Sequence, residues 1–352
     1  MTDSKHIPET MHALQTVKTG SAEESLKYVQ VETPKVTRPT DILIQVKAAG
    51  VNPVEAKARQ GNVIPFMSTP RILGGDYAGI VVDKGNQVTE FEIGDAVYGT
   101  LSMPVGPNGS YAEFVLASKG SGCIVKKPDN ISFEEAAGCG VALMTAYQAI
   151  TRLGNLPKEG PKKVLVIGAS GGVGTYAVQY AKALPETQVV GICSSKNIEL
   201  VRGLGADRVI DYTSKEAMDA LVKDEFETYD LIVDCVGGDD YYNQLVNLLK
   251  KKGTFSTAVG PAIHVGSEKV GLFGGAKIVA TVLGRKLFGS RSYQVVTYLP
   301  WSHLATDVAP LLADGKIKTV LKDDQVFDLK DGAQAHKMIE SHRTVGKIVL
   351  RV

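Results

Sequence analysis

The stretch that decides the fold is Val164-Leu-Val-Ile-Gly-Ala-Ser-Gly-Gly-Val-Gly174. An apolar run meets a glycine cluster, and a helical pattern follows at once, so the order predicts a strand, a tight turn and a helix. Glycines in such a turn let the backbone come close to a pyrophosphate, and the N–H groups at the start of the helix then face its negative charge. The stretch therefore predicts a dinucleotide-binding site.

The glycine pattern departs in one place from the G-x-G-x-x-G fingerprint, because Ala169 stands before Gly171 and Gly174 where the first glycine is expected. A glycine turn alone is a weak signal, but this one begins a domain in which strands and helices alternate. Such alternation predicts an α/β fold with parallel strands and right-handed crossovers. The expected strands are 163–167, 188–193, 229–236 and 253–259, and the expected helices are 173–184, 198–204 and 240–249.

Both ends of the chain have a different pattern. Residues 11–130 contain short apolar runs separated by turn residues, which predicts a barrel-like β domain. A capping box at Ser132-Phe-Glu-Glu135 predicts a helix that continues to about Ile150. Near the end, residues 328–339 look helical and residues 346–352 look like a closing strand. We expect a nucleotide domain over residues 132–295, inserted into a β domain formed by residues 1–131 and 296–352.

Net charge, apolar content and cysteine spacing limit the kinds of protein that this chain can be. The 352 residues include 39 basic and 38 acidic side chains, so the net charge of +1 gives no indication of a nucleic-acid partner. The amino-terminal residues lack the features of a signal peptide, and no stretch is apolar enough to cross a bilayer. The cysteines Cys123, Cys139, Cys193 and Cys235 form no C-x-x-C pair, which favours reduced thiols and a cytoplasmic location, with attachment to the face of an organelle left open.

The end of the second expected strand bears on the choice of cofactor. An acid at this point of the fold would hold the ribose 2′-hydroxyl of NADH, but the segment Cys193-Ser-Ser-Lys196 contains none. Ser194, Ser195 and Lys196 instead offer donors and one positive charge to a 2′-phosphate. The sequence therefore favours NADPH over NADH.

The segment Val270–Phe288 is apolar, rich in glycine and lightly basic. We interpret it as a core segment or a contact between subunits. A surface helix that touches a membrane is the alternative, which its scattered charges make less favourable.

Several further motifs occur in order along the chain. Because of these motifs, the chain resembles the zinc-independent quinone oxidoreductase (zeta-crystallin-like) branch of the medium-chain dehydrogenase/reductase superfamily. These motifs are Ala48-Ala-Gly-Val-Asn-Pro-Val-Glu55, Gly74-Gly-Asp-Tyr-Ala-Gly-Ile-Val81, Ile93-Gly-Asp-Ala-Val-Tyr-Gly99, Gly109-Ser-Tyr-Ala-Glu-Phe114, Leu143-Met-Thr-Ala-Tyr147 and Gly346-Lys-Ile-Val-Leu350. The resemblance implies a GroES-like β-barrel domain, a Rossmann doubly wound sheet and a homodimer.

The resemblance also implies roles for individual residues. Gly171, Gly172 and Val173 are expected at the pyrophosphate, and Ser194, Lys196 and Tyr212 around the 2′-phosphate. Asn52 and Thr145 are expected near the nicotinamide half. Val236 and Val259 are expected along the cofactor groove.

Zinc-dependent relatives hold a catalytic ion with Cys, His and Cys, and the matching positions here are Asn52, Asp76 and Cys139. One amide, one carboxylate and one thiol make a poor zinc site, and the structural zinc lobe is absent. The histidines show no metal spacing, and each is expected on a surface or in a loop: His6, His12, His264, His303, His336 and His342.

Without an ion to polarise a carbonyl, the favoured substrate is a conjugated acceptor, whose developing charge spreads into an enolate. We therefore expect an NADPH-dependent, metal-free reductase of α,β-unsaturated carbonyls or quinones, with Asn52 as the candidate that holds the ribose or a substrate oxygen. Asn52 is nearly as well explained as a residue of an Asn-Pro turn. An NADPH-binding interaction or regulatory protein is the second hypothesis, and a zinc alcohol dehydrogenase is the third.

Overall fold

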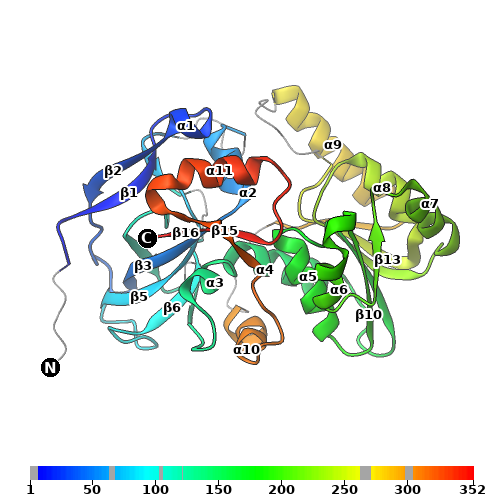
Figure 1. Cartoon of the computed structure of the whole chain (residues 1–352), viewed down its shortest axis with the longest axis horizontal. Helices are drawn as coiled ribbons and strands as arrows, with labels where there is room; N and C mark the ends of the chain where they lie inside the picture. Colours follow the sequence, from blue (N-terminus) through cyan, green and yellow to red (C-terminus); the bar gives the residue numbers. More distant parts are fainter. Residues whose placement is uncertain (1–6, 63–67, 103–105, 121, 262–270, 298–303) are drawn as a thin grey trace. The chain divides into compact units, whose positions relative to one another are not determined.

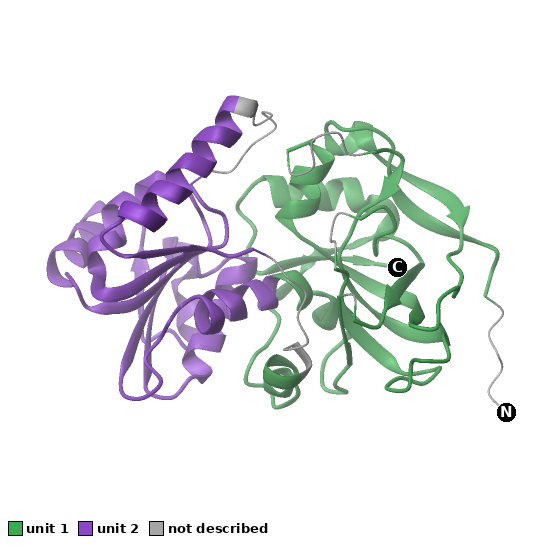
Figure 2. Ribbon diagram, turned by 180° about the vertical axis from the view of Figure 1, so that it is seen from behind, with its two compact units in different colours: residues 1–141, 299–352 green, residues 142–298 purple. Residues whose placement is uncertain are grey.

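The structure is a computed structural model, and it describes residues 7–62, 68–102, 106–120, 122–261, 271–297 and 304–352. The chain divides into two compact units, shown in different colours in Figure 2. Unit 1 consists of residues 1–141 and 299–352, and unit 2 of residues 142–298. None of the helices among the described residues is both long and apolar enough to cross a membrane.

Unit 2 contains one sheet of six parallel strands, in the order β11-β10-β9-β12-β13-β14. Two of these strands, β10 and β13, are labelled in Figure 1. The strand order 3-2-1-4-5-6 is that of a Rossmann fold, and the direction of winding changes between β9 and β12. The predicted doubly wound sheet is therefore confirmed. The strands are β9 (Lys162–Ile167), β10 (Thr187–Cys193), β11 (Arg208–Asp211), β12 (Tyr229–Asp234), β13 (Leu249–Thr257) and β14 (Ser292–Val295).

The helices of unit 2 connect these strands. They are α5 (Gly172–Ala183), α6 (Ile198–Gly203), α7 (Lys215–Asp224), α8 (Asp239–Leu245) and α9 (Leu272–Phe288). Every residue of β12 is buried, which agrees with the apolar run that a parallel strand needs when both of its faces are covered. The sequence pattern misses β11 and β14, because each has only four residues.

Unit 1 contains two sheets. In the larger one the order is β15-β16-β3-β5-β6-β8, with β7 also paired to β3, and in the smaller one it is β2-β1-β4. The strands are β1 (Thr10–Thr16), β2 (Leu26–Glu32), β3 (Asp41–Val51), β4 (Arg71–Ile72), β5 (Asp76–Lys84), β6 (Ala96–Thr100), β7 (Phe114–Ser118), β8 (Cys123–Lys126), β15 (Leu321–Asp328) and β16 (Lys347–Arg351). The predicted closing strand is confirmed, since β16 pairs antiparallel with β3 and joins the two ends of the chain.

Short helices complete unit 1: α1 (Ala22–Ser25), α2 (Pro53–Arg59), α3 (Phe133–Ala137), α10 (Ala309–Ala313) and α11 (Gly332–Glu340). The predicted capping box is confirmed, because Glu135 N donates to Ser132 Oγ at 3.1 Å and Ser132 N donates to the Glu135 carboxylate at 2.7 Å. The single helix predicted as far as Ile150 is wrong. The chain breaks at Gly138, and α4 (Gly140–Tyr147) starts afresh before a π-helical turn over Gln148–Arg152.

Two further predictions are wrong for reasons of packing. His336 is fully buried on the inner face of α11, where Arg59 Nε donates to its Nδ1 at 3.4 Å. Burial, and then the charge of Arg59, lower the pKa of His336 to about 3. Of the two interpretations of Val270–Phe288, the core segment is wrong, because α9 leaves Phe273, Leu287 and Phe288 largely exposed, and the contact between subunits stays a prediction. His6, His264 and His303 lie outside the described residues.

Candidate functional site

The glycine turn lies between the carboxyl end of β9 and the start of α5. Gly168 has a φ of +74°, and Gly174 lies so close that a Cβ on it would stand 2.1 Å from the Gly168 carbonyl oxygen. These two glycines therefore serve the turn and the packing of helix on strand. A Cβ on Gly171, in contrast, would meet no atom of the described residues closer than 3.4 Å. Packing does not require this glycine, and the space above it is open to a ligand.

The first turn of α5 presents unpaired donors. The N–H groups of Gly172 and Val173 have no acceptor among the residues that the structure describes, whereas Thr175 N donates to the Gly171 carbonyl at 2.9 Å. The turn contains no acidic side chain, so nothing offsets the positive end of the helix dipole. This arrangement is suited to bind the negative charge of a phosphate.

The end of β10 is tied to the glycine turn by a buried amide. Asn197 Nδ2 donates to Ser170 Oγ at 3.1 Å and to Ser194 Oγ at 3.2 Å. Lys196 is exposed and has no ion-pair partner among the described residues. The segment therefore presents an unpaired ammonium beside a turn whose position Asn197 fixes. Our sequence reasoning missed Asn197, although an asparagine three residues after Ser194 is a common sign of a local side-chain bridge.

The sequence reasoning also missed an acid on the neighbouring strand. Asp211 ends β11 and lies in register with Cys193. Hydrogen bonds from the Thr213 side chain, at 2.7 Å, and then from its N–H, at 2.9 Å, keep the pKa of Asp211 below its usual value. Asp211 is therefore charged at neutral pH. A carboxylate beside a ribose favours a free 2′-hydroxyl and repels a 2′-phosphate, so Asp211 counts against the preference for NADPH that Ser194, Ser195 and Lys196 predict.

A buried carboxylate joins the ends of β12 and β13. Asp234 Oδ1 accepts the N–H groups of Val236 and Gly237, both at 2.9 Å, and its Oδ2 accepts the Thr257 hydroxyl at 2.8 Å. Thr257 Oγ1 in turn accepts the N–H of Val259 at 3.2 Å. Burial raises the pKa of Asp234. This pair fixes both loops that carry Val236 and Val259, and the acid at the end of an apolar run was the signal that could have revealed it.

The structure brings most of the predicted cofactor residues to one edge of the sheet. Since the strands are parallel, the residues that follow their carboxyl ends share that edge. Thr145 belongs to α4 and does not follow a strand, and it is 8% exposed, whereas Asn52 belongs to unit 1. The residues at the shared edge are Gly171, Gly172, Val173, Ser194, Ser195, Lys196, Tyr212, Val236 and Val259.

In unit 1, Asn52 precedes α2 and lies in a buried polar cluster. Its Nδ2 donates to Asp76 Oδ2 at 2.9 Å and to Glu55 Oε1 at 3.3 Å. Its Oδ1 accepts the Lys347 ammonium at 2.6 Å. The amide is 2% exposed, and all of its polar groups are used within the protein. We call Asn52, Glu55, Asp76 and Lys347 the Asn52 cluster.

Neighbouring backbone holds the cluster in place. Asp76 Oδ1 accepts the N–H of Val141 at 2.8 Å, and a Cβ on Gly140 would lie 2.1 Å from that oxygen. Lys347, on β16, also donates to the Val51 carbonyl at 3.2 Å and lies 3.9 Å from Asp76 Oδ2. The glycine at position 140 thus makes room for the carboxylate, and β16 supplies the positive charge.

The Asn52 cluster contains two carboxyl groups and one ammonium. Burial, and then the charge of Asp76, raise the pKa of Glu55 to about 8. Burial also raises the pKa of Asp76 and lowers that of Lys347. The arrangement that leaves no net charge is a protonated Glu55 beside an Asp76–Lys347 ion pair.

Of the three positions expected for zinc ligands, Asn52 and Asp76 belong to the Asn52 cluster, and the third is the thiol of Cys139. Cys139 is fully buried, and its Sγ lies 3.4 Å from the Glu135 carbonyl oxygen. In the part of the chain that the structure describes, no three His, Cys, Asp or Glu side chains are grouped so as to hold a metal ion. The positive group between Asn52 and Asp76 is the Lys347 ammonium.

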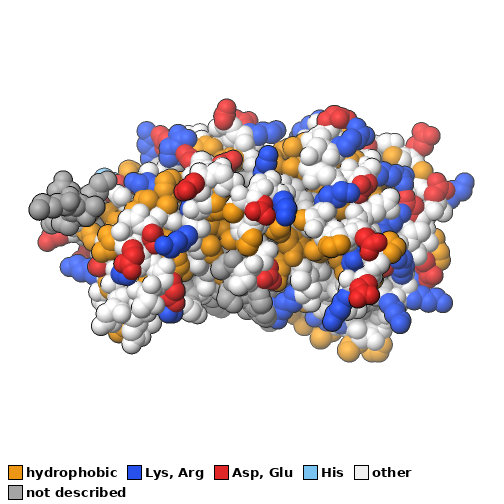
Figure 3. All heavy atoms as spheres, turned by 90° about the horizontal axis from the view of Figure 1, so that it is seen from below, with side chains coloured by type: hydrophobic (Ala, Val, Ile, Leu, Met, Phe, Trp, Pro, Cys, Tyr) orange, Lys and Arg blue, Asp and Glu red, His pale blue; other side chains and the backbone are white. Residues whose placement is uncertain are grey.

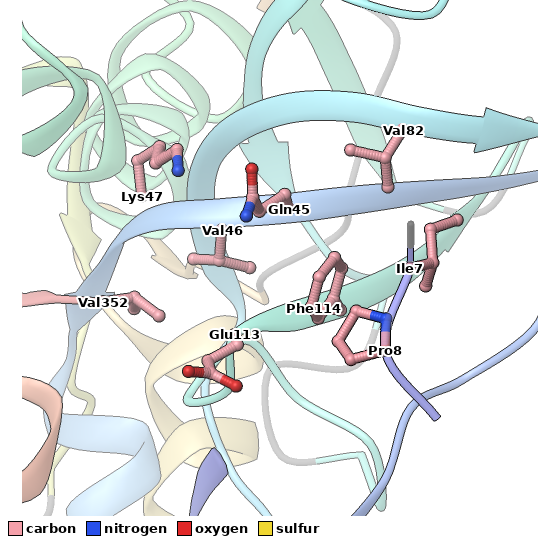
Figure 4. A pocket seen from close by; sticks show the side chains of 9 residues that line it. All are labelled: Ile7, Pro8, Gln45, Val46, Lys47, Val82, Glu113, Phe114 and Val352. Carbon is pink, nitrogen blue, oxygen red and sulfur yellow. The ribbon is translucent and has the colours of Figure 1, made fainter. Parts of the chain in front are cut away.

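A separate hollow occurs on unit 1, where the amino-terminal segment runs beside β3 (Figure 4). Apolar side chains such as Phe114 and Pro8 lie next to one another there, and Glu113 and Lys47 are the charged residues. None of the predicted site residues lines it, so we assign it no part in the reaction. Its lining is Ile7, Pro8, Gln45, Val46, Lys47, Val82, Glu113, Phe114 and Val352.

Comparison with known proteins agrees with both units. Residues 38–129 match the model of the alcohol dehydrogenase GroES-like domain, and residues 204–350 match that of the zinc-binding dehydrogenases. The chain is 32% identical over 346 residues to a chloroplastic quinone-oxidoreductase homolog of Spinacia oleracea, which covers 97% of this chain and 98% of the relative.

A second relative and one solved structure give the same picture. The chain is 30% identical to a mitochondrial NAD(P)H oxidoreductase of Homo sapiens, covering 94% of this chain and 86% of that protein. The solved quinone oxidoreductase of Coxiella burnetii is 28% identical and superposes with a TM-score of 0.80 over 97% of this chain and 99% of its own. The chain therefore belongs to the medium-chain dehydrogenase/reductase superfamily of oxidoreductases.

Proposed function

We propose that this protein is an NADPH-dependent, metal-free reductase of α,β-unsaturated carbonyls or quinones. The observation that carries the proposal is the unpaired Lys196 ammonium at the same sheet edge as the free N–H groups that begin α5. One cationic side chain and one helix N-terminus fit the two phosphate positions of NADPH. The names of the relatives support the reaction class, since they are quinone and NAD(P)H oxidoreductases.

When bound, NADPH supplies a hydride from C4 of its nicotinamide ring. In the proposed complex, the N–H groups of Gly172 and Val173 bind the pyrophosphate above Gly171. The side chains of Ser194, Ser195, Lys196 and Tyr212 bind the 2′-phosphate. The Asp234 carboxylate orients the two loops that carry Val236 and Val259 toward the cofactor groove.

Asn52 remains the residue of unit 1 that we propose holds the ribose or a substrate oxygen. Its amide now serves Lys347, Asp76 and Glu55, so binding a ligand requires it to give up one of these partners. The Glu55 bond, at 3.3 Å, is the longest of the three and is the one that we expect to be exchanged. The reaction consumes one hydride and one proton, and the proton comes from water in this proposal.

The proposed lack of a metal is supported by the chemistry of the donors. An amide whose oxygen already accepts a lysine ammonium offers no lone pair of the strength that zinc needs, and Cys139 lies buried beside a carbonyl. Without a strong Lewis acid, a conjugated acceptor is favoured over a simple ketone, because its negative charge spreads over several atoms.

Steady-state oxidation of NADPH against a panel of quinones, enals and enones tests the proposal, with NADH as the comparison. We expect turnover of at least one conjugated acceptor, a higher kcat/KM with NADPH, and no loss of activity after treatment with a chelator. Tight binding of NADPH without turnover of any acceptor would refute the enzymatic part. A bound metal that is essential for activity would refute the metal-free part.

The variant Lys196→Ala tests the 2′-phosphate contact. Loss of a charge-assisted contact of about 1.5–3 kcal/mol is expected to raise the KM for NADPH about 10- to 100-fold and to leave the KM for NADH unchanged. Lys251→Ala is the matched control, because Lys251 is an exposed lysine near the amino end of β13, at the opposite edge of the sheet. Equal effects of both variants, or of Lys196→Ala on both cofactors, would contradict the assignment.

A further inference from the structure

Helix α9 is fixed to unit 2 by one of its faces. The Arg285 guanidinium stacks on the Tyr242 ring, 3.8 Å from its centroid, and lies 5.2 Å from that of Tyr293. The same side chain pairs with Asp239 at 2.6 Å and is 11% exposed, and Val282 packs against the core of the sheet. These contacts determine which face of α9 is turned away from the sheet.

The opposite face is apolar and exposed. Phe273 is 90% exposed, Val279 58%, Leu283 51% and Leu287 70%. At about 100° per residue, these four side chains fall within an arc of about 120°. We call this arc the α9 stripe. Its other described members are Ala276 and Ala280, both exposed, so it contains no charged residue.

Two lysines border the α9 stripe, one on each side. Phe273 and Val279 are the two borders of the stripe. Around the helix axis, Lys277 lies about 40° outside the border at Phe273, and Lys286 lies about 20° outside the border at Val279. Both are exposed, and neither forms an ion pair within the described part of the chain. The sequence of α9 contains no Asp or Glu. The local charge is therefore positive, whereas on the face drawn in Figure 3 blue and red side chains alternate.

We propose that α9 is a membrane-docking helix that lies in the headgroup region of a bilayer containing anionic lipids. An apolar stripe flanked by lysines suits this position, because the stripe enters the acyl boundary while the ammonium groups reach up to the phosphates. A fixed helix loses little conformational freedom when it binds. The inference does not depend on the reductase activity.

A second copy of the chain is the less suitable partner for the α9 stripe. Pairing of two stripes would bring the bordering lysines of both copies, four ammonium groups in all, to one interface. The helix offers no acid to offset these charges. Anionic lipid headgroups, in contrast, are complementary to both lysines.

Vesicle sedimentation of the full chain tests the proposal, with phosphatidylcholine vesicles containing or lacking 30% phosphatidylserine. We expect association with the anionic vesicles at low salt, weaker association with neutral ones, and release at high salt. The double variant Leu283→Glu/Leu287→Glu is expected to abolish association. The double variant Lys277→Gln/Lys286→Gln is expected to weaken it about five-fold for each lysine.

Ile93→Glu/Phe226→Glu is the matched control, since these residues are 66% and 62% exposed and lie outside α9. It should bind vesicles like the wild type, and circular dichroism melts should show that all variants are folded. Absence of vesicle binding by the wild type would overturn the proposal, as would equal binding to neutral vesicles. Self-association that the Leu283→Glu/Leu287→Glu variant removes, without vesicle binding, would assign the stripe to a second copy.

Discussion

Replacing Lys347 by methionine tests the Asn52 cluster most directly. The change leaves Asn52 Oδ1 and the Val51 carbonyl without their buried donor, and removes the positive charge 3.9 Å from Asp76. Lys347 is 3% exposed, so water does not readily replace the ammonium. Removal of one partner of a buried ion pair costs about 3–5 kcal/mol, and we expect a loss of this size in the free energy of unfolding.

A double-mutant cycle in urea, followed by circular dichroism, measures this loss. The variants are Lys347→Met, Asp76→Asn and the combination of both. Because the two side chains share one cluster, the combination should cost about 1–3 kcal/mol less than the sum of the single changes. Hydrogen exchange of the β3 and β16 amides should report the same loss within unit 1.

The control for the cycle is Lys251→Met, which alters an exposed lysine and should change stability by no more than about 0.5 kcal/mol. Two results would refute the reasoning. One is a Lys347→Met variant within about 1 kcal/mol of the wild type, and the other is strict additivity with Asp76→Asn.

Three further changes have defined outcomes. The pKa of Glu55 is raised to about 8 in the folded protein. The stability that this raised pKa contributes is therefore complete below the ordinary pKa of a glutamate, near 4.5, and is lost as the pH rises through 8. Urea titrations from pH 5 to 8 should show a decline of about 3–5 kcal/mol that Glu55→Gln removes, and an unchanged decline would contradict the assignment. Asp211→Asn should lower the KM for NADPH about three- to ten-fold relative to NADH by removing a repulsion between the carboxylate and the 2′-phosphate, and a rise would place Asp211 in another role. Gly174→Ala puts a Cβ 2.1 Å from a backbone oxygen, so it should lower the free energy of unfolding by about 1–3 kcal/mol and weaken cofactor binding in calorimetry. The control Gly203→Ala, whose Cβ meets nothing within 4 Å, should have neither effect.

The sequence is most informative about unit 2 because its signals are local there. The strand, turn and helix around Gly171 follow from a few adjacent residues, and a parallel sheet then brings the ends of β10, β12 and β13 to the same edge. The site residues that the sequence pattern does not reveal are brought to the site by strands that are neighbours in space but not in sequence. Asp211 enters the site only because β11 pairs with β10, and the four residues of β11 are too short a run to show periodicity.

Unit 1 is harder to predict, because its buried polar groups come from distant parts of the chain. Asn52 and Lys347 are 295 residues apart, and Arg59 reaches His336 across 277 residues. A lysine in a short strand is usually solvated, and a histidine on an amphipathic helix can lie on either face. Only the pairing of β16 with β3 shows that Lys347 points into the Asn52 cluster.

The Asn52 cluster also explains why we propose conjugated acceptors. Lys347 donates to Asn52 and Val51 and pairs with Asp76, so its ammonium is occupied by protein acceptors. Its charge orders the amide of Asn52 but is not free to bind an oxyanion. An amide N–H stabilises negative charge less than a metal ion does, and the remaining stabilisation must come from the substrate itself. An enone or a quinone provides it by delocalisation, whereas a simple ketone does not. The ratio of kcat/KM for an enone to that for the matching saturated ketone should therefore be large, and a ratio near one would contradict this account of the cluster.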